Sequence, residues 1–214
     1  MKSKMNLLFA FLYFLCIPIG YISNLFNPLF DDIYYGHLEY VFNCIVRVII
    51  YIALFITLHF VYKKVDNTKE EKQQLPIKNK VVLYIITFFF ITIVSLMSGW
   101  QLKPLSDLGE KYTLIQIYDK LGDIAVLAAE IYIMISMFKH FDIFYTNNNF
   151  KQFKYFSLSI LLVLLTFNIY HLIFNFNIYQ LIFIPFTILL GFIYPYTQKS
   201  FWKTYLISVL VFLF

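Results

Sequence analysis

The stretch LAAEIYIM, from Leu127 to Met134, places one carboxylate inside an otherwise apolar run that extends from Ile124 to Phe138. Without Glu130 this run has the composition of an ordinary membrane-spanning helix. Moving an ionised carboxylate out of water is costly, and charged side chains inside a bilayer usually face the helix bundle, where they are paired or functional. Glu130 therefore predicts a polar contact or a site in the interior of a membrane protein.

The composition of the whole chain supports the same interpretation. The 214 residues are 61% hydrophobic and 14% charged, whereas a soluble domain averages about half apolar and about a quarter charged. Apolar runs of about 20 residues, long enough to cross the hydrocarbon core, recur along the chain. We predict an all-α fold, a polytopic transmembrane bundle of about seven helices. The predicted spans are Asn6–Asn24, His37–Val61, Val81–Trp100, Asp119–Phe138, Tyr155–Phe174, Ile178–Tyr196 and Trp202–Phe214.

These spans form one integral membrane domain, residues 1–214. Residues 1–118 supply the first helices and a hydrophilic loop, residues 63–80, and residues 119–214 form the second part. The last span has only 13 residues, or about 20 Å of helix, against a hydrocarbon core of about 30 Å. Either this helix begins before Trp202, or the bilayer thins locally, or the chain ends within the outer leaflet.

The positions of the basic residues predict the orientation. If the N-terminus is cytoplasmic, 13 of the 17 Lys and Arg residues lie in cytoplasmic segments, and only Lys103, Lys111 and Lys120 lie outside. Such a bias is typical of membrane proteins with the N-terminus inside. The apolar run from Met5 to Ile22 resembles a signal peptide, but no small-x-small cleavage site follows it. We predict that it is an uncleaved first helix.

Several other classes of function find no support in the sequence. The net charge of +5 comes from loops beside helix ends rather than from a nucleic-acid-binding patch. The chain contains no Gly-rich phosphate loop, no CxxC pair and no HExxH. Cys16 and Cys44 both fall in predicted helices, where free cysteines commonly pack as small apolar residues. We predict no metal, no cofactor and no nucleic-acid partner, and we expect membrane lipid as a neighbour.

A few ionisable residues fall inside or near the ends of the predicted spans. They are Arg47, Asp123, Glu130, Glu39, His59 and His171. Asp123 and Glu130 are seven positions apart and share one helix face. Arg47 is the one permanent cation within a predicted span, so we expect it to face Glu130 or Asp123. Such a contact could be a buried pair that fixes helix packing, a proton relay or a catalytic remnant.

The C-terminal half carries a more specific pattern. The segment LLGFIYPYTQKSFWKTYLISVLVFLF, Leu189–Phe214, resembles the last conserved block of the CPBP family, also called Abi. This family comprises CAAX-prenyl proteases and bacteriocin-processing or immunity proteins. FNIYH, Phe167–His171, is similar to the family's F-x-x-x-H motif, and AAEIYIMISMFKHF occupies the place of its E-E-x-x-x-R block. The resemblance covers roughly Asp119 to Phe214 and implies a bacterial plasma-membrane protein. The residues that fit the last block are Gly191, Tyr194, Thr197, Ser200 and Trp202.

The chain departs from the family pattern at the polar positions. Ala129 stands where the family has its first Glu and Met134 where it has Arg, while Ser208 and Phe212 stand where it has His and Asn. In active members a Glu and a His activate water, and the second His and the Asn stabilise the oxyanion. Loss of a general base typically costs about 10²–10⁴ in rate, and loss of an oxyanion donor about 10²–10³.

The resemblance thus implies that Glu130 and His171 are what remains of a catalytic set, with Ser208 at a family His position. We expect a non-catalytic protein that binds a protein or peptide partner in or at the membrane, as a bacteriocin-immunity-type or cell-envelope regulatory factor. One alternative is an active intramembrane endopeptidase that uses Glu130 and His171. Another is a small transporter or membrane subunit in which Asp123, Glu130 and Arg47 form a charge path.

Overall fold

The computed structural model describes residues 2–23, 25, 36–65, 76–97, 114–148, 157–168 and 183–213. Nearly all of these residues are helical, and none of them lies in a β-strand. The helices are α1 (Lys2–Gly20), α2 (Gly36–Val65), α3 (Ile77–Met97), α5 (Leu114–Asn147), α6 (Ile160–Val163), α8 (Phe183–Tyr196) and α9 (Phe201–Leu213), and α6 continues into the π-helical turn η3 (Leu164–Asn168). The all-α prediction is confirmed, and each of the seven predicted segments has a helical counterpart.

The helix bounds differ from the predicted spans in an informative way. The fourth span, predicted as Asp119–Phe138, is part of the 34-residue helix α5. The helix continues past Phe138 because KHFDIFYTN contains neither Gly nor Pro to end it, even though its polarity increases. Hydropathy marks the apolar part of a helix, whereas backbone hydrogen bonding continues until a residue breaks it.

Three helices are long and apolar enough to cross a membrane, among the residues described. Their apolar segments are Lys4–Ser23, Tyr40–Lys63 and Lys120–Asn147. The apolar helices Ile184–Tyr196 and Phe201–Val211 are shorter. The last helix begins at Phe201, directly after the turn at residues 197–199, so it does not start much earlier than its predicted first residue, Trp202.

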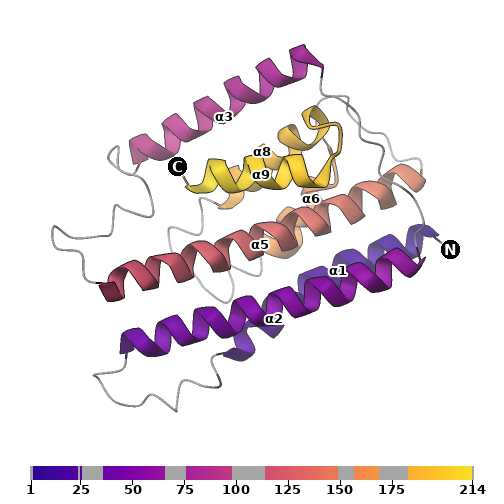
Figure 1. Cartoon of the computed structure of the whole chain (residues 1–214). Helices are drawn as coiled ribbons and strands as arrows, with labels where there is room; N and C mark the ends of the chain where they lie inside the picture. Colours follow the sequence, from indigo (N-terminus) through magenta and orange to yellow (C-terminus); the bar gives the residue numbers. More distant parts are fainter. Residues whose placement is uncertain are drawn as a thin grey trace.

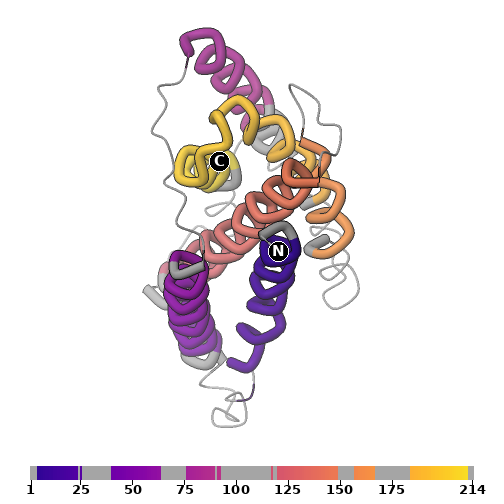
Figure 2. The backbone as a smooth tube through the Cα atoms, turned by 90° about the vertical axis from the view of Figure 1, so that its right-hand side faces the viewer, coloured from indigo at the N-terminus to yellow at the C-terminus, as the bar shows by residue number. Residues whose placement is uncertain are grey.

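Helix α5 occupies the centre of the arrangement (Figure 1). It packs against α1 and α2 on one side and against α9 on the other, while α3 packs on α8 and α9. Figure 2 shows the same order from the end of the bundle, with α5 between the α1–α2 pair and the C-terminal helices. Because α5 is covered from several sides, its middle is apolar around its whole circumference. Ile131, Ile133, Met134, Ile135 and Met137 are all almost completely buried.

The outer face of α2 is apolar but exposed. Ile45, Ile49, Ile52, Ile56 and Phe60 follow each other at steps of three or four residues and form one stripe, which we call the α2 outer stripe. Each of these side chains is about half exposed or more, with Ile52 at 49%. A stripe of this kind on a long helix is suited to contact with lipid tails.

Helices α2 and α5 run in one direction and α1, α3 and α9 in the other, so one end of the bundle collects particular helix ends (Figure 1). The start of α1, the end of α2, the start of α3, the end of α5 and the start of α9 lie at this end (Figure 1). We call it the Lys-rich end, because its helices and adjoining turn carry Lys4, Lys63, Lys78, Lys80, Lys139, Lys199 and Lys203. Lys120 lies near the other end of α5.

Candidate functional site

Glu130 lies in the buried part of α5 and is 8% exposed. Among the described residues, Arg47 on the neighbouring helix α2 is the cation whose charge acts on the Glu130 carboxylate. The Arg47 guanidinium also lies 4.2 Å from the centroid of the Tyr21 ring, in a cation–π contact. The packing of α2 against α5 thus brings together a carboxylate and a guanidinium that are 83 positions apart in the sequence.

Asp123 is placed differently from Glu130, although both belong to α5. The hydroxyl group of Tyr40 donates a hydrogen bond to Asp123 Oδ1. Lys120, one turn earlier on α5, forms an ion pair with Asp123 Oδ2 at 3.6 Å. The Asp123 side chain is 43% exposed. Its described partners therefore come from the start of α2 and from its own helix.

Ser208 is fully buried on α9 and uses its proton within its own helix. Its hydroxyl donates to the backbone oxygen of Thr204 at 2.6 Å. One turn earlier, the hydroxyl of Tyr205 donates to the backbone oxygen of Ala128 at 3.3 Å and so joins α9 to α5. His171, the other residue that the family resemblance assigns to catalysis, lies outside the described residues, as does the side chain of Phe212.

Met134, which the resemblance sets at the family's Arg position, is completely buried. The hydroxyl of Thr187 on α8 donates to its sulfur at 3.6 Å. Ala129, which the resemblance sets at the position of the family's first Glu, is also buried. Both side chains pack in the core of the helix bundle.

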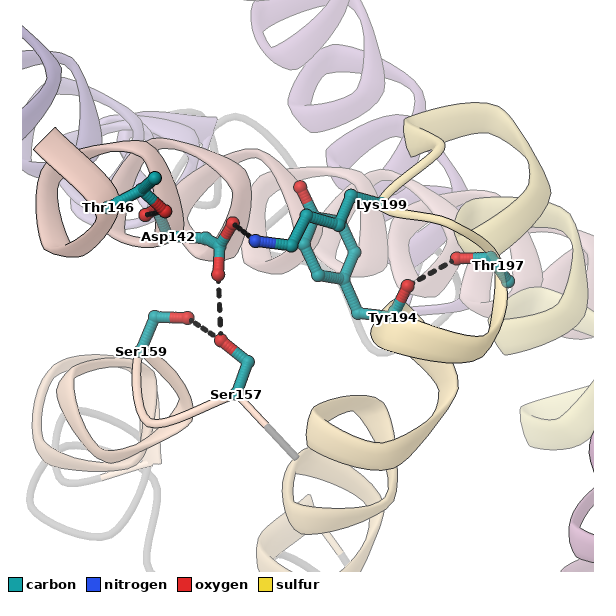
Figure 3. A network of polar contacts seen from close by, with 7 residues as sticks. All are labelled: Asp142, Thr146, Ser157, Ser159, Tyr194, Thr197 and Lys199. Atoms are coloured by element: carbon teal, nitrogen blue, oxygen red, sulfur yellow. Dashed lines mark hydrogen bonds and ion pairs between the residues drawn. The ribbon is translucent and has the colours of Figure 1, made fainter. Parts of the chain in front are cut away.

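A second polar cluster, which was not predicted from the sequence, lies at the Lys-rich end. Asp142 on α5 is 2% exposed and receives two contacts (Figure 3). Ser157 Oγ donates to Asp142 Oδ1 at 2.9 Å, and Lys199 Nζ lies 2.8 Å from Asp142 Oδ2. Because the single Ser157 proton is used on Asp142, Ser159 is the donor in the 2.6 Å contact between the two serine hydroxyls. This network, the Asp142 cluster, ties α5 to the segments before α6 and after α8.

The turn between α8 and α9 holds Lys199 in place for this contact. Gln198 and Lys199 have φ angles of 56° and 60°, in the left-handed region that costs a non-Gly residue about 1 kcal/mol or more. The turn is supported by hydrogen bonds from Thr197 Oγ1 and from the Lys199 backbone N–H to the backbone oxygen of Tyr194, at 2.8 and 3.0 Å (the former drawn in Figure 3). The Asp142–Lys199 ion pair offsets part of the backbone strain.

His140, between Lys139 and Asp142 on α5, forms a third cluster. Its ring stacks against Phe9 and Tyr13 of α1, with both ring centroids 5.6 Å away. The Tyr62 ring from α2 meets it edge-on at 4.6 Å. Asn6 Oδ1 lies 3.1 Å from His140 Nδ1 and accepts a hydrogen bond from the Tyr62 hydroxyl at 3.2 Å. Since an amide oxygen can only accept, His140 Nδ1 carries a proton.

A cavity of about 150 Å³ lies beside His140 at the Lys-rich end. We call it the His140 cavity. It lies where α1, α2, α5 and α9 meet, and neither Glu130 nor Ser208 lines it. Its lining residues are Tyr13, His59, Tyr62, Tyr132, Ser136, Lys139, His140, Phe201 and Trp202.

Sequence signals for these two clusters were present but weak. Lys139, His140 and Asp142 follow directly on the predicted end of the fourth span at Phe138. Their charges were consistent with a solvated helix end, and nothing local distinguishes a buried Asp142 from an exposed one. Asn6, at the predicted start of the first span, gave no separate signal.

No group of three potential metal-ligating His, Cys, Asp or Glu side chains lies together among the residues described. Cys16 and Cys44 are buried in helices and are not joined in a disulfide. Comparison of the chain with protein-family models, curated proteins and solved structures finds no match.

Proposed function

We propose that this chain is a multi-pass protein of a bacterial plasma membrane, with its N-terminus in the cytoplasm, and that it acts without catalysis. In this proposal it binds a membrane or secreted protein or peptide, as bacteriocin-immunity and cell-envelope regulatory proteins of the CPBP (Abi) type do. The resemblance of residues 119–214 to that family supplies the class of function. The surroundings of Glu130 supply the reason to favour binding over proteolysis.

The membrane location is supported by two features of the helices. Three of them are long and apolar enough to cross a bilayer, and α2 presents an outer stripe of Ile and Phe that a soluble protein would rarely leave uncovered. The orientation is supported by the Lys-rich end, because cytoplasmic segments of membrane proteins carry an excess of Lys.

The absence of catalysis is supported by one observation above all. Glu130 is buried against α2, where the charge of Arg47 acts on it, and it does not line the His140 cavity. A general base needs a water molecule within hydrogen-bond reach, and its own lone pair must be available to take the proton of that water. A buried carboxylate that feels the charge of a guanidinium on a neighbouring helix is better suited to stabilise the packing of two helices. Ser208 already donates its hydroxyl proton to the backbone oxygen of Thr204, so it is likewise a poor hydrogen-bond donor to an oxyanion.

A complementation assay tests this proposal. A strain that lacks the chain is complemented with wild type or with the Glu130→Gln, His171→Ala double variant and is challenged with membrane-active peptide bacteriocins. We expect wild type and double variant to protect equally, with equal amounts of protein in the membrane. Arg47→Leu is the structural control: it leaves Glu130 without this cation and lowers the amount of folded protein.

Two results of this assay would contradict the proposal in different ways. Loss of protection in the double variant at a normal protein level would point to the endopeptidase. Failure of wild type to protect against any peptide would argue against an immunity function. The transporter alternative predicts protection that depends on Asp123 as well, which Asp123→Asn measures.

A further inference from the structure

The His140 cavity has the chemistry of an anion site. Its described lining contains one Lys, two His and several hydroxyl groups, from Tyr13, Tyr62, Tyr132 and Ser136, and no carboxylate. The nearby carboxylate, Asp142, lies one turn from Lys139 and is engaged by Lys199 and Ser157 instead. The Tyr62 and Ser136 hydroxyl groups already donate their protons, to Asn6 and to the backbone oxygen of Tyr132. Lys139, in a lining whose described residues include no carboxylate, therefore carries the preference for a phosphate or carboxylate ligand.

The volume of the cavity limits the size of that ligand. A cavity of about 150 Å³ matches the size that holds a benzene molecule. Drug-sized ligands and cofactors occupy clefts of about 300–1,000 Å³. A phosphate with a few adjoining atoms fits, whereas a nucleotide does not.

The position of the cavity indicates where such a phosphate comes from. The cavity lies at the Lys-rich end, among α1, α2, α5 and α9. Trp202, which is 59% exposed, and the exposed His59 belong to its lining. Exposed Trp and Tyr side chains typically lie at the membrane–water interface, and basic pockets between transmembrane helices on the cytoplasmic side are suited to phospholipid headgroups.

We propose that the His140 cavity binds the phosphate of an anionic phospholipid from the cytoplasmic leaflet. Lys139 supplies the charge and a charge-assisted hydrogen bond to the phosphate, and the acyl chains leave along the aromatic side chains of Phe201 and Trp202. The stacking of His140 between Phe9 and Tyr13 fixes the wall of the cavity. This site rests on the proposed membrane location and orientation, and it is independent of the absence of catalysis.

Trp202 provides a direct measurement. The chain has two Trp residues, so Trp100→Phe leaves Trp202 as a single fluorophore at the cavity. The protein in a neutral detergent is titrated with short-chain phosphatidylglycerol, with phosphatidylcholine of equal chain length and with inorganic phosphate. We expect a saturable change in Trp202 fluorescence with phosphatidylglycerol, a much weaker one with phosphatidylcholine and a weaker affinity for phosphate alone.

Charge variants in this background locate the site. Lys139→Gln should weaken phosphatidylglycerol binding about tenfold or more, as loss of a charge-assisted hydrogen bond implies, and Lys139→Arg should retain most of it. Lys63→Gln is the matched control, because Lys63 lies at the same end on α2 but does not line the cavity. Circular dichroism of each variant checks the fold, and Lys139→Arg keeps the test valid if Lys139→Gln unfolds.

The proposal is overturned by equal binding of phosphatidylcholine, by equal losses in Lys139→Gln and Lys63→Gln, or by unchanged binding in Lys139→Gln. Binding of inorganic phosphate as tight as that of the lipid would assign the site to free phosphate rather than to a headgroup. A chain recovered outside the membrane fraction would contradict the proposed membrane location itself. Failure of the lipid site can therefore be distinguished from failure of the membrane location.

Discussion

Lys199 Nζ lies 2.8 Å from Asp142 Oδ2, and this ion pair joins the strained turn before α9 to the buried face of α5, 57 positions earlier in the chain. The two side chains differ in exposure: the Lys199 side chain is 47% exposed, whereas that of Asp142 is 3% exposed. Loss of Lys199 therefore leaves a buried carboxylate with the Ser157 hydroxyl as its side-chain donor among the described residues. Loss of the Asp142 charge leaves a lysine that water can reach.

The first prediction follows from this asymmetry. Lys199→Met should lower the free energy of unfolding by about 1–2 kcal/mol, after allowance for the solvent exposure of Lys199. Asp142→Asn should lower it by about 1 kcal/mol or less. The asparagine can still accept the hydrogen bond from Ser157. The measurement is thermal unfolding in detergent followed by circular dichroism, and equal losses in the two variants would contradict the assignment.

The second prediction concerns the contact between α1 and α2 at Gly20. A Cβ atom added to Gly20 would collide with the Tyr51 ring, which is fully buried. Gly20→Ala should therefore cost about 1–3 kcal/mol through overpacking. Tyr51→Phe should be neutral or stabilising, because the Tyr51 hydroxyl is buried without a hydrogen-bond partner among the described residues.

The double variant checks the cause of this effect. In Gly20→Ala, Tyr51→Leu the cost of the alanine should fall by half or more, since the smaller side chain leaves room for the added methyl group. Additive losses in denaturant unfolding would show that Gly20 is required for another reason.

The third prediction tests the electrostatic interaction between Arg47 and Glu130. Arg47→Leu should destabilise wild type by more than it destabilises the Glu130→Gln background, because the single change leaves a buried carboxylate without this cation. A coupling of about 0.5–3 kcal/mol is expected for side chains that act on each other. If the two changes simply add, Arg47 and Glu130 are independent. Lys63→Leu on α2 is the matched control, because Lys63 is exposed and should show no coupling to Glu130.

The fourth prediction concerns Asn6, whose amide oxygen lies within hydrogen-bond distance of His140 and Tyr62. Asn6→Leu removes both contacts and should destabilise the protein by about 1–2 kcal/mol, since single hydrogen bonds between membrane helices average about 0.6 kcal/mol. Asn6→Asp keeps an acceptor oxygen in the same place and should cost less. Unfolding in detergent compares the two, and the opposite order would exclude an acceptor role for Asn6.

The fifth prediction distinguishes a lipid-facing stripe from an ordinary protein surface. Ile52 is 49% exposed near the middle of α2. In a bilayer, Ile52→Lys should impair insertion by about 2.5–3.5 kcal/mol, whereas a surface change in water usually costs less than about 0.5 kcal/mol. The amount of chain that resists alkaline extraction from membranes measures this difference. Ile52→Leu should insert normally, and equal insertion of both variants would place this stripe outside the bilayer.

Much of the helical framework was predictable from local sequence. Apolar runs of about 20 residues, separated by polar segments, indicated helices at the positions where seven helical segments occur. The prediction failed at helix ends, as in α5, because hydropathy marks the apolar part of a helix rather than its last hydrogen bond. The polar residues within the spans could be identified singly. Arg47 was expected to face Glu130 or Asp123, because so few charges lie there.

The residues at the Lys-rich end could not be predicted in the same way. Lys139, His140 and Asp142 are neighbours in the sequence, yet Asp142 is engaged by Lys199 while His140 stacks on Phe9 and Tyr13. Which helix covers which face of α5 decides these partners, and no local pattern records that choice.

The sequence alone determined that this chain is helical and apolar, because a backbone within a hydrocarbon layer must satisfy its hydrogen bonds locally and an α-helix does so within one segment. Only the tertiary structure decided that Asn6 meets His140, 134 positions away, that Lys199 reaches Asp142, and that Glu130 is buried outside the lining of the His140 cavity. These contacts depend on side-chain packing between helices, which is set by shape over several faces at once rather than by the spacing of residues along one of them.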